Sequence, residues 1–307
     1  MLTKTTERVL FVLIVLLVYG PTLVLAQTQQ PNADRPKITE EELDTHFELA
    51  RSLAQEKKFE QALKEYLLVF DNSRDVAKYG GVRLSYVPSE IASIGRVYPP
   101  AILALQSRRD EREKLVLAAK ADFDVLHELT SLNEHLNEPE RNLVLFDKLK
   151  TLGPAYSDLR EDMLRLIWEQ LAAARRYDDL KDTVDELAKQ VASQIAESAV
   201  NNDFPDNSVL SSTEYQGYLR RSIIEDGARV YETLLGVGKA EKADKLAKWM
   251  FTFSSDGEMY AQLINGAINA KRIDIASNLV ERATKTLRRT EDLRLVREAA
   301  QRLPKVK

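Results

Sequence analysis

The sequence predicts an all-α protein, arranged as an α-solenoid of stacked antiparallel helix pairs. Gly and Pro number only 11 and 10 in 307 residues, and both residues are unfavourable in helix interiors. Apolar residues recur with the period of amphipathic helices, and no segment shows the strict alternation typical of a strand. Short polar turns separate the helical segments, so consecutive helices are expected to pack antiparallel.

The first 26 residues predict a signal peptide. Lys4 and Arg8 precede the apolar run Val9–Val18, and the small residue Ala26 fits cleavage by signal peptidase. The alternative is an uncleaved membrane anchor formed by residues 9–26, although a bilayer span needs about 20 apolar residues. In both cases the positively charged N-terminal end is expected to stay on the cytoplasmic side of the membrane. The rest of the chain is expected to be exported, to a bacterial periplasm or to the cell exterior.

The composition limits the class of partner. The chain contains no Cys, so neither internal disulfides nor a disulfide-linked oligomer is expected. The formal net charge is −4, and a mildly acidic body gives no reason to expect nucleic acid as a partner. A membrane is expected as a partner only if the N-terminal segment is uncleaved.

The first helix pair follows a polar linker, residues 27–38. Thr39 and Glu42 form a capping-box pattern that predicts the start of a helix at this point. A second amphipathic helix is predicted from Phe59 onwards. Because only a short turn joins these two helices, they are expected to form an antiparallel pair.

The next segment is the least regular part of the chain. The residues Tyr79-Gly80-Gly81 predict a break in the helical pattern. A short helix is predicted from Val87 to Tyr98, and Pro100 then provides a proline at the start of the following helix. This aromatic and Pro-rich region, residues 80–109, is the place where a pocket is expected if the protein is an enzyme.

The remaining pattern is helical, with one interior break. Further helices are predicted at 122–136, 140–152, 158–174, 178–198, 214–235, 239–253, 257–270, 273–287 and 291–303. The polar, proline-containing stretch 201–212 interrupts them. The predicted organisation is a signal peptide (1–26), a flexible linker (27–38), an N-terminal helical-repeat region (39–200), a linker (201–212) and C-terminal helical repeats (213–307).

The clearest internal repeat has a spacing of about 33 residues. Small or apolar residues match at each position. The matched residues are Tyr231, Leu234, Leu235, Ala240, Ala243, Leu246 and Ala247 in one copy, and Ile264, Ala267, Ile268, Ile273, Ala276, Leu279 and Val280 in the next. A unit of this length cannot bury its own apolar face, so neighbouring units are expected to stack.

The repeat resembles the tetratricopeptide repeat family. The best single unit, residues 44–74, has large, small and aromatic residues at the family's positions: Leu49, Ala50, Phe59, Ala62 and Tyr66. Arg74 stands where the family has a closing proline, so the array is degenerate. An unrelated α-solenoid or a loose helical bundle is the alternative.

The resemblance implies a concave binding face formed by the first helix of each unit. The residues that it assigns to this face are Asp44, Phe47, Arg51 and Gln55 in the first unit, and Glu258, Ala261, Asn265 and Asn269 in the last. The two asparagines lie one helical turn apart, a spacing suited to bonding an extended peptide backbone. The alternative is a pair of merely exposed asparagines. No basic residue that would hold a peptide carboxylate is evident beside them in the sequence.

Candidate catalytic and metal-binding motifs are weak. The pairs His127-Glu128 and Glu134-His135 lack the spacing of a zinc motif, and a zinc site needs three or four ligands. The segment Gly236–Lys239 is followed by Ala240 rather than by the Ser or Thr of a phosphate-binding loop. We therefore predict no catalytic residue, no metal and no cofactor.

The function predicted from the sequence is that of an exported scaffold that binds a protein or peptide, and not that of an enzyme. One alternative is an enzyme or enzyme subunit with its pocket in residues 80–109. Another is an architectural spacer on a membrane tether. The basic stretch 281–307 is read as the solvated cap of the last repeat, with a patch for an anionic partner as the alternative.

Overall fold

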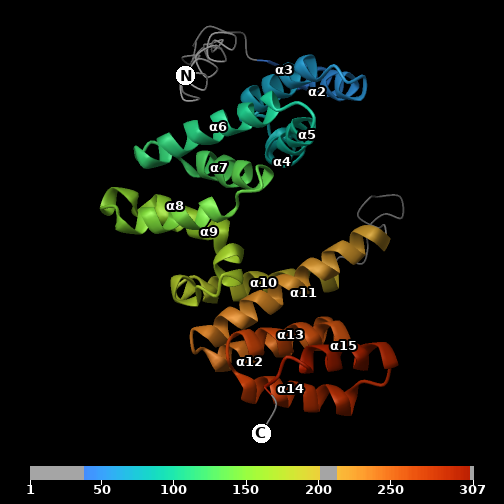
Figure 1. The fold of residues 1–307 in the computed structure, drawn as a ribbon. Helices are drawn as coiled ribbons and strands as arrows, with labels where there is room; N and C mark the ends of the chain where they lie inside the picture. Colours follow the sequence, from blue (N-terminus) through green and yellow to red (C-terminus); the bar gives the residue numbers. More distant parts are fainter. Residues whose placement is uncertain (1–37, 201–212, 305–307) are drawn as a thin grey trace, which may run out of the picture.

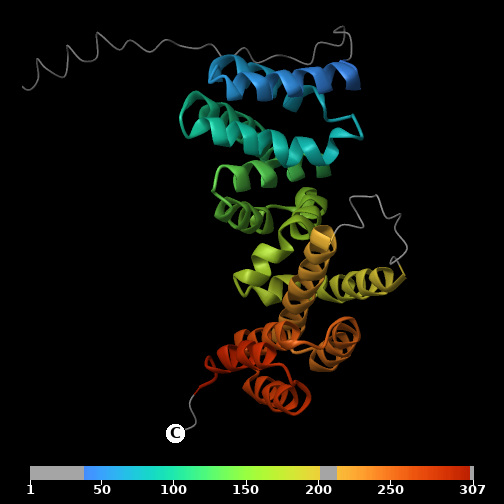
Figure 2. The same ribbon diagram turned by 90° about the vertical axis from the view of Figure 1, so that its right-hand side faces the viewer.

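The computed structural model describes residues 38–200 and 213–304, and all regular secondary structure in these ranges is helical. This confirms the predicted all-α class. The predicted signal peptide 1–26, nearly all of the linker 27–38 and the interior linker 201–212 lie outside the described residues. The helices are stacked broadly in chain order from one end of the molecule to the other (Figure 1 and Figure 2), except that α15 (Thr290–Ala300) returns to lie beside α13 (Gly257–Asn269).

The helices begin and end close to the predicted positions. The first part of the chain contains α2 (Glu40–Gln55), α3 (Phe59–Asn72), α4 (Tyr79–Leu84), α5 (Tyr86–Gly95), α6 (Pro100–Leu117), α7 (Phe123–His135), α8 (Glu140–Thr151) and α9 (Ser157–Ala173). The second part contains α10 (Val184–Val200), α11 (Thr213–Gly236), α12 (Ala240–Phe253), α13 (Gly257–Asn269), α14 (Ile273–Thr286) and α15 (Thr290–Ala300). Two short 3₁₀ helices, η1 (Pro154–Tyr156) and η2 (Tyr177–Leu180), precede α9 and α10. The predicted helix 178–198 is therefore divided between η2 and α10.

Local capping explains why several helices start where they do. The predicted capping box is confirmed: the Thr39 hydroxyl accepts from the amide of Glu42 at 3.2 Å, and the Glu42 carboxylate accepts from the amide of Thr39 at 2.8 Å. Asp122 and Asp256 accept from the amide nitrogens three residues later and cap α7 and α13. Each cap satisfies an amide that has no partner inside its helix.

The predicted break at Tyr79-Gly80-Gly81 is wrong, because these residues form the first turn of α4. Each helical glycine costs about 1 kcal/mol relative to alanine, but tertiary contacts hold the helix. The Tyr79 side chain is buried, and its hydroxyl donates to Asp44 at 2.7 Å. Arg83 donates from Nε to the carbonyl of Phe70 at 2.8 Å. Packing therefore overrides the local preference.

The buried apolar side chains form three clusters along the chain. One lies mainly among α2 to α6, the second mainly among α6 to α9, and the third among α10 to α15. Trp168 of α9 packs against both the second and the third cluster, so it joins the two parts of the molecule. Helices α10 and α11, on either side of the predicted linker 201–212, pack against each other. Within the described parts of the chain, no helix combines the length and apolarity needed to cross a bilayer.

Candidate binding groove

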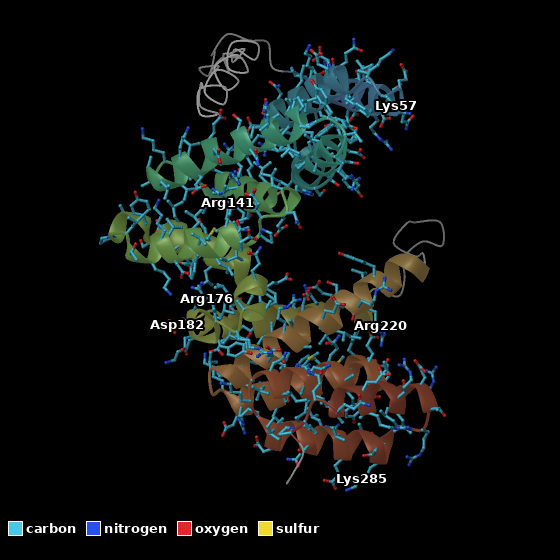
Figure 3. The ribbon with its side chains drawn as sticks, in the orientation of Figure 1. Lys57, Arg141, Arg176, Asp182, Arg220 and Lys285 are labelled. Atoms are coloured by element: carbon cyan, nitrogen blue, oxygen red, sulfur yellow. The ribbon has the colours of Figure 1, made fainter. Side chains whose placement is uncertain are left out.

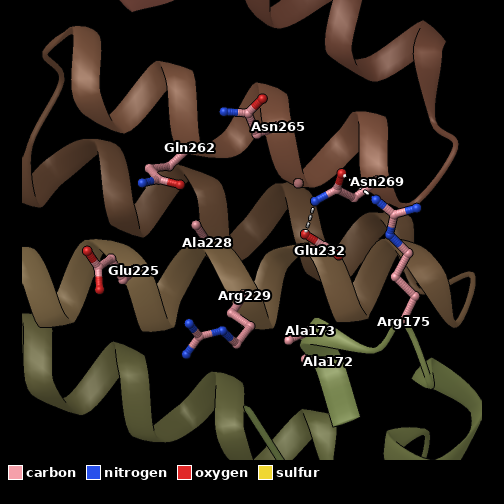
Figure 4. Close-up of a pocket in the computed structure, with 11 residues that line it drawn as sticks. Ala172, Ala173, Arg175, Glu225, Ala228, Arg229, Glu232, Gln262, Asn265 and Asn269 are labelled. Carbon is pink, nitrogen blue, oxygen red and sulfur yellow. Dashed lines mark hydrogen bonds between the residues drawn. The ribbon is translucent and has the colours of Figure 1, made fainter. Parts of the chain in front are cut away.

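A groove of about 310 Å³ lies where α9, α11 and α13 meet. Figure 4 shows Gln262, Asn265 and Asn269 on α13, with Arg175 and Arg229 approaching from the side of α9 and α11. A second groove of about 280 Å³ begins at the shared residues Glu225 and Arg229 and continues along α11 and α9. The two form one polar surface, which we call the α13 groove.

Small residues allow α11 and α13 to approach closely beneath the groove. Gly266 and Ala228 are buried and line the groove. A β-carbon on Gly266 would lie 3.3 Å from Cβ of Glu232 and 3.4 Å from the carbonyl oxygen of Ala228. A larger side chain at this position would therefore push the two helices apart.

Helix α13 presents a polar stripe to the groove and its apolar side to the core. Residues separated by three or four positions share a helix face, and this spacing relates Glu258, Gln262, Asn265 and Asn269. Of these, the last three line the groove. The apolar residues between them are buried in the third cluster: Leu263, Ile264 and Ala267.

Glu258, at the other end of the stripe, forms an ion pair. Arg220 of α11 (Figure 3) donates to the Glu258 carboxylate at 2.5 Å and also to Asp256. The ion pair ties the start of α13 to α11. Glu258 is therefore a link between helices as well as a member of the predicted binding face.

Arg229 and Glu169 form the wall of the groove opposite α13. Arg229 Nη1 lies 2.5 Å from the Glu169 carboxylate and 3.6 Å from that of Asp226. Its guanidinium lies 6.0 Å from the ring centroid of Trp168. Partial burial raises the pKa of Glu169, Arg229 opposes this rise, and Asp226 adds to it.

Glu232 joins Asn269 to the turn that follows α9. Its carboxylate accepts from the Tyr177 hydroxyl at 2.6 Å and from Asn269 Nδ2 at 2.9 Å. Burial and the hydrogen bond to Glu232 raise the pKa of Tyr177. The Tyr177 ring lies against Gly236, where a β-carbon would come within 2.2 Å of it. These contacts hold the first part of the molecule on α11.

Two arginines reach the asparagine pair from distant parts of the sequence. Arg175, 94 residues from Asn269 in the chain, donates to its Oδ1 at 3.1 Å. Arg302 donates to the same oxygen at 2.7 Å and to Oδ1 of Asn265 at 2.5 Å. Sequence reasoning missed both arginines because neither lies near the asparagines in the chain. The sequence predicts a turn at Arg175-Arg176-Tyr177 but does not indicate that Arg175 reaches α13.

The residues predicted for the first unit lie on α2, at the opposite end of the molecule from α13 (Figure 1). Asp44 accepts from Lys78 at 2.6 Å and from Tyr79. Phe47 packs edge-on against the ring of Tyr66. Arg51 pairs with Glu48, and Gln55 is exposed. The structure therefore does not bring the two predicted sets together in one site.

The irregular region 80–109 forms the remainder of α4, together with α5 and the first half of α6. Helix α5 contacts α3, α6 and α7, and α4 contacts α5 and α7. The α13 groove is lined by other residues. In the described ranges no group of three or more His, Cys, Asp or Glu side chains is arranged to hold a metal ion.

Glu128, considered above as part of a metal motif, belongs to a buried cluster of ion pairs. Its carboxylate lies 2.8 Å from Arg83 Nη1 and 2.8 Å from Arg112 Nε. Arg74 Nε is 3.6 Å away. Burial raises the pKa of Glu128, but the hydrogen bonds and charges of Arg83 and Arg112 outweigh burial and lower the pKa below its ordinary value. This cluster joins the segment that follows α3 to α4, α6 and α7.

The chain matches no family model, and no curated protein and no solved structure matches it either. Any statement about function therefore rests on the residues of the groove.

Proposed function

We propose that the protein is an exported scaffold whose α13 groove binds an extended peptide segment of a partner protein. The polar stripe of α13, facing Arg175 and Arg229 across the groove, is the observation that carries this proposal. Export is inferred from the apolar N-terminal segment with its preceding positive charges. The helix pairs are assigned to a degenerate, tetratricopeptide-like α-solenoid on the basis of the repeated small and apolar positions.

The chemistry of the groove suits a peptide backbone. Each carboxamide offers one acceptor oxygen and two N–H donors, and a peptide backbone has the complementary groups free whenever it is extended. Gln262, Asn265 and Asn269 provide a row of such groups along α13. Gly266 and Ala228 at the base of the groove are buried and have small side chains, so that a bound chain can approach the helix backbones closely.

Binding fits these groups better than catalysis does. Carboxamides and guanidiniums do not transfer protons at neutral pH. The groove carboxylates Glu169 and Glu232 already accept from Arg229, from Tyr177 and from Asn269. These contacts engage both carboxylates with other side chains of the protein. We therefore infer that the groove recognises a ligand rather than transforming it.

Site-directed photo-cross-linking tests the proposal. A benzophenone side chain placed at Gln262, inside the groove, is expected to capture one contiguous segment of a partner when the 27–307 form is exposed to its own envelope extract. The matched control carries the same group at Lys248, which lies on the exposed face of α12. Equal labelling from both positions, or no adduct from Gln262, would contradict the proposal.

A further inference from the structure

The last two helices carry exposed arginines that have no carboxylate partner. Arg282 lies on α14, and Arg288 and Arg289 lie in the turn between α14 and α15. All three residues are exposed, and among the described residues none of them has a carboxylate oxygen within 4.0 Å of its guanidinium. We call these three residues the arginine surface.

The acidic residues nearest to the arginine surface in the chain are paired with other residues or buried. Glu281 lies 2.5 Å from Lys285, which Figure 3 labels on α14. Glu291 lies 2.6 Å from Arg294, and Asp292 is buried. The positive charge of the arginine surface is therefore met by no ion pair, although the whole chain has a formal net charge of −4.

Two of the three arginines are held in place by neutral groups. The guanidinium of Arg282 lies 4.4 Å from the ring centroid of Phe251 in α12. Arg288 donates through Nη1 to the carbonyl oxygens of Lys285 at 2.9 Å and of Leu287 at 3.2 Å. A cation is favourable at the C-terminal end of a helix, which explains the position of Arg288. These contacts fix the two guanidiniums at the surface and leave their charge available to an anion.

The surface around the arginines lacks the apolar anchors of a typical protein interface. No large apolar side chain of α14 or α15 is exposed, and both polar grooves are lined by residues outside these two helices. Protein interfaces depend on aromatic and apolar anchors at their centre. A contact with anionic lipid head groups needs only cations near the lipid surface, and a guanidinium can donate two parallel hydrogen bonds to a phosphate. These features favour a lipid surface over a protein partner.

We propose that the arginine surface docks the protein on a membrane that contains anionic phospholipids. Helix α14 lies at the end of the molecule away from α2 (Figure 1). Because the chain as a whole is acidic, an anionic membrane repels most of it, and we expect α14 and α15 to face the lipid. This inference does not depend on the proposed peptide groove, since neither α14 nor α15 lines that groove.

Vesicle flotation of the 27–307 form tests the proposal. The probes are vesicles of phosphatidylcholine and the same vesicles with about 30% phosphatidylglycerol, which makes their surface negative. Soluble polyglutamate serves as a model of an acidic protein. The principal variant combines Arg282→Gln, Arg288→Gln and Arg289→Gln.

Two control variants accompany it. One combines Lys57→Gln, Lys148→Gln and Lys181→Gln, which removes the same charge at exposed positions where the described structure has no ion pair. The other replaces the three arginines of the arginine surface by lysine, which keeps the charge. Circular dichroism checks that each variant remains folded.

The protein is expected to float with the phosphatidylglycerol vesicles and not with phosphatidylcholine alone. The principal variant is expected to bind about 100-fold more weakly, at about fivefold for each cation removed from an anionic surface. Both controls are expected to retain most of the binding. Raising NaCl from about 0.1 M to about 1 M shortens the Debye length from about 10 Å to about 3 Å and is expected to abolish it.

Four results overturn the inference. Equal flotation with both vesicle types, or with neither, leaves no role for anionic lipid. A loss in the Lys57, Lys148 and Lys181 control as large as in the principal variant shows that net charge alone matters. A loss as large in the lysine control contradicts the electrostatic argument. Tighter binding of polyglutamate than of phosphatidylglycerol vesicles, lost in the principal variant, assigns the arginine surface to an acidic protein instead.

Discussion

Glu128 offers the sharpest test of the packing in the first part of the molecule. It is 1% exposed, accepts a hydrogen bond from Arg112 Nε at 2.8 Å, and forms an ion pair with Arg83 Nη1 at 2.8 Å. The substitution Glu128→Gln keeps the volume of the side chain but removes its charge. It also places an amide group, which donates, against guanidiniums that only donate. One charge-assisted bond is lost, and the buried Arg83 is left without an anion.

The substitution is expected to lower the free energy of unfolding by about 3 kcal/mol, because a charged hydrogen bond is lost and Arg83 stays buried without its carboxylate partner. The assay is urea denaturation followed by far-UV circular dichroism, with hydrogen exchange at α4 and α7 to locate the effect. The control is Glu60→Gln, which removes the exposed pair with Lys64 and is expected to cause no measurable change.

The cost is also expected to depend on pH. The arginines hold the pKa of Glu128 in the folded protein below its ordinary value of 4.5. A depressed carboxyl pKa stabilises the fold above the unfolded pKa, and this stability is lost as the pH falls through the folded pKa. The difference between wild type and Glu128→Gln should therefore shrink on acidification below the ordinary value. A difference that stays constant, or one no larger than that of Glu60→Gln, would refute the reasoning.

Two further substitutions test the packing and the turns, both by urea denaturation. Gly257→Ala would place a β-carbon 2.3 Å from Cα of Asp292 in α15, so the free energy of unfolding is expected to fall by about 1–3 kcal/mol. The control is Gly81→Ala, where a β-carbon would have nothing within 4 Å, and this substitution should be neutral or stabilising. Equal effects of the two substitutions would contradict the packing argument. Lys271, in the turn between α13 and α14, has a φ of +60°. Lys271→Gly should stabilise the protein by about 1 kcal/mol, because glycine adopts this conformation without steric cost. A loss of stability would contradict this argument.

Helix boundaries were the most predictable feature because their causes are local. Thr39 and Glu42 form their capping box within one turn of chain. Pro100 at the start of α6 acts through its own backbone geometry. The break predicted at Gly80-Gly81 failed because Tyr79 and Arg83 are held by residues of other helices.

The candidate groove was predictable only in part. Asn265 and Asn269 could be found because their spacing on one helix places them on one face, and the structure puts both in the groove. The sequence did not reveal which arginines reach these asparagines, since Arg175 comes from the turn after α9 and Arg302 from the residues that follow α15. The relative positions of separate helices depend on packing, which periodicity does not encode.

The sequence by itself determined that the described chain is helical and which side of each helix is polar, because both follow from residue preference and from the 3.6-residue period. Only the tertiary structure decided what each polar side faces. On α2, Asp44 is occupied by Lys78 and Tyr79. Gly266 of α13 and Ala228 of α11 are small enough to bring these two helices close together beneath a polar groove. The physical reason is that helices contact one another through residues that are far apart in the sequence, and the helical period of one segment does not determine which other segment packs against it.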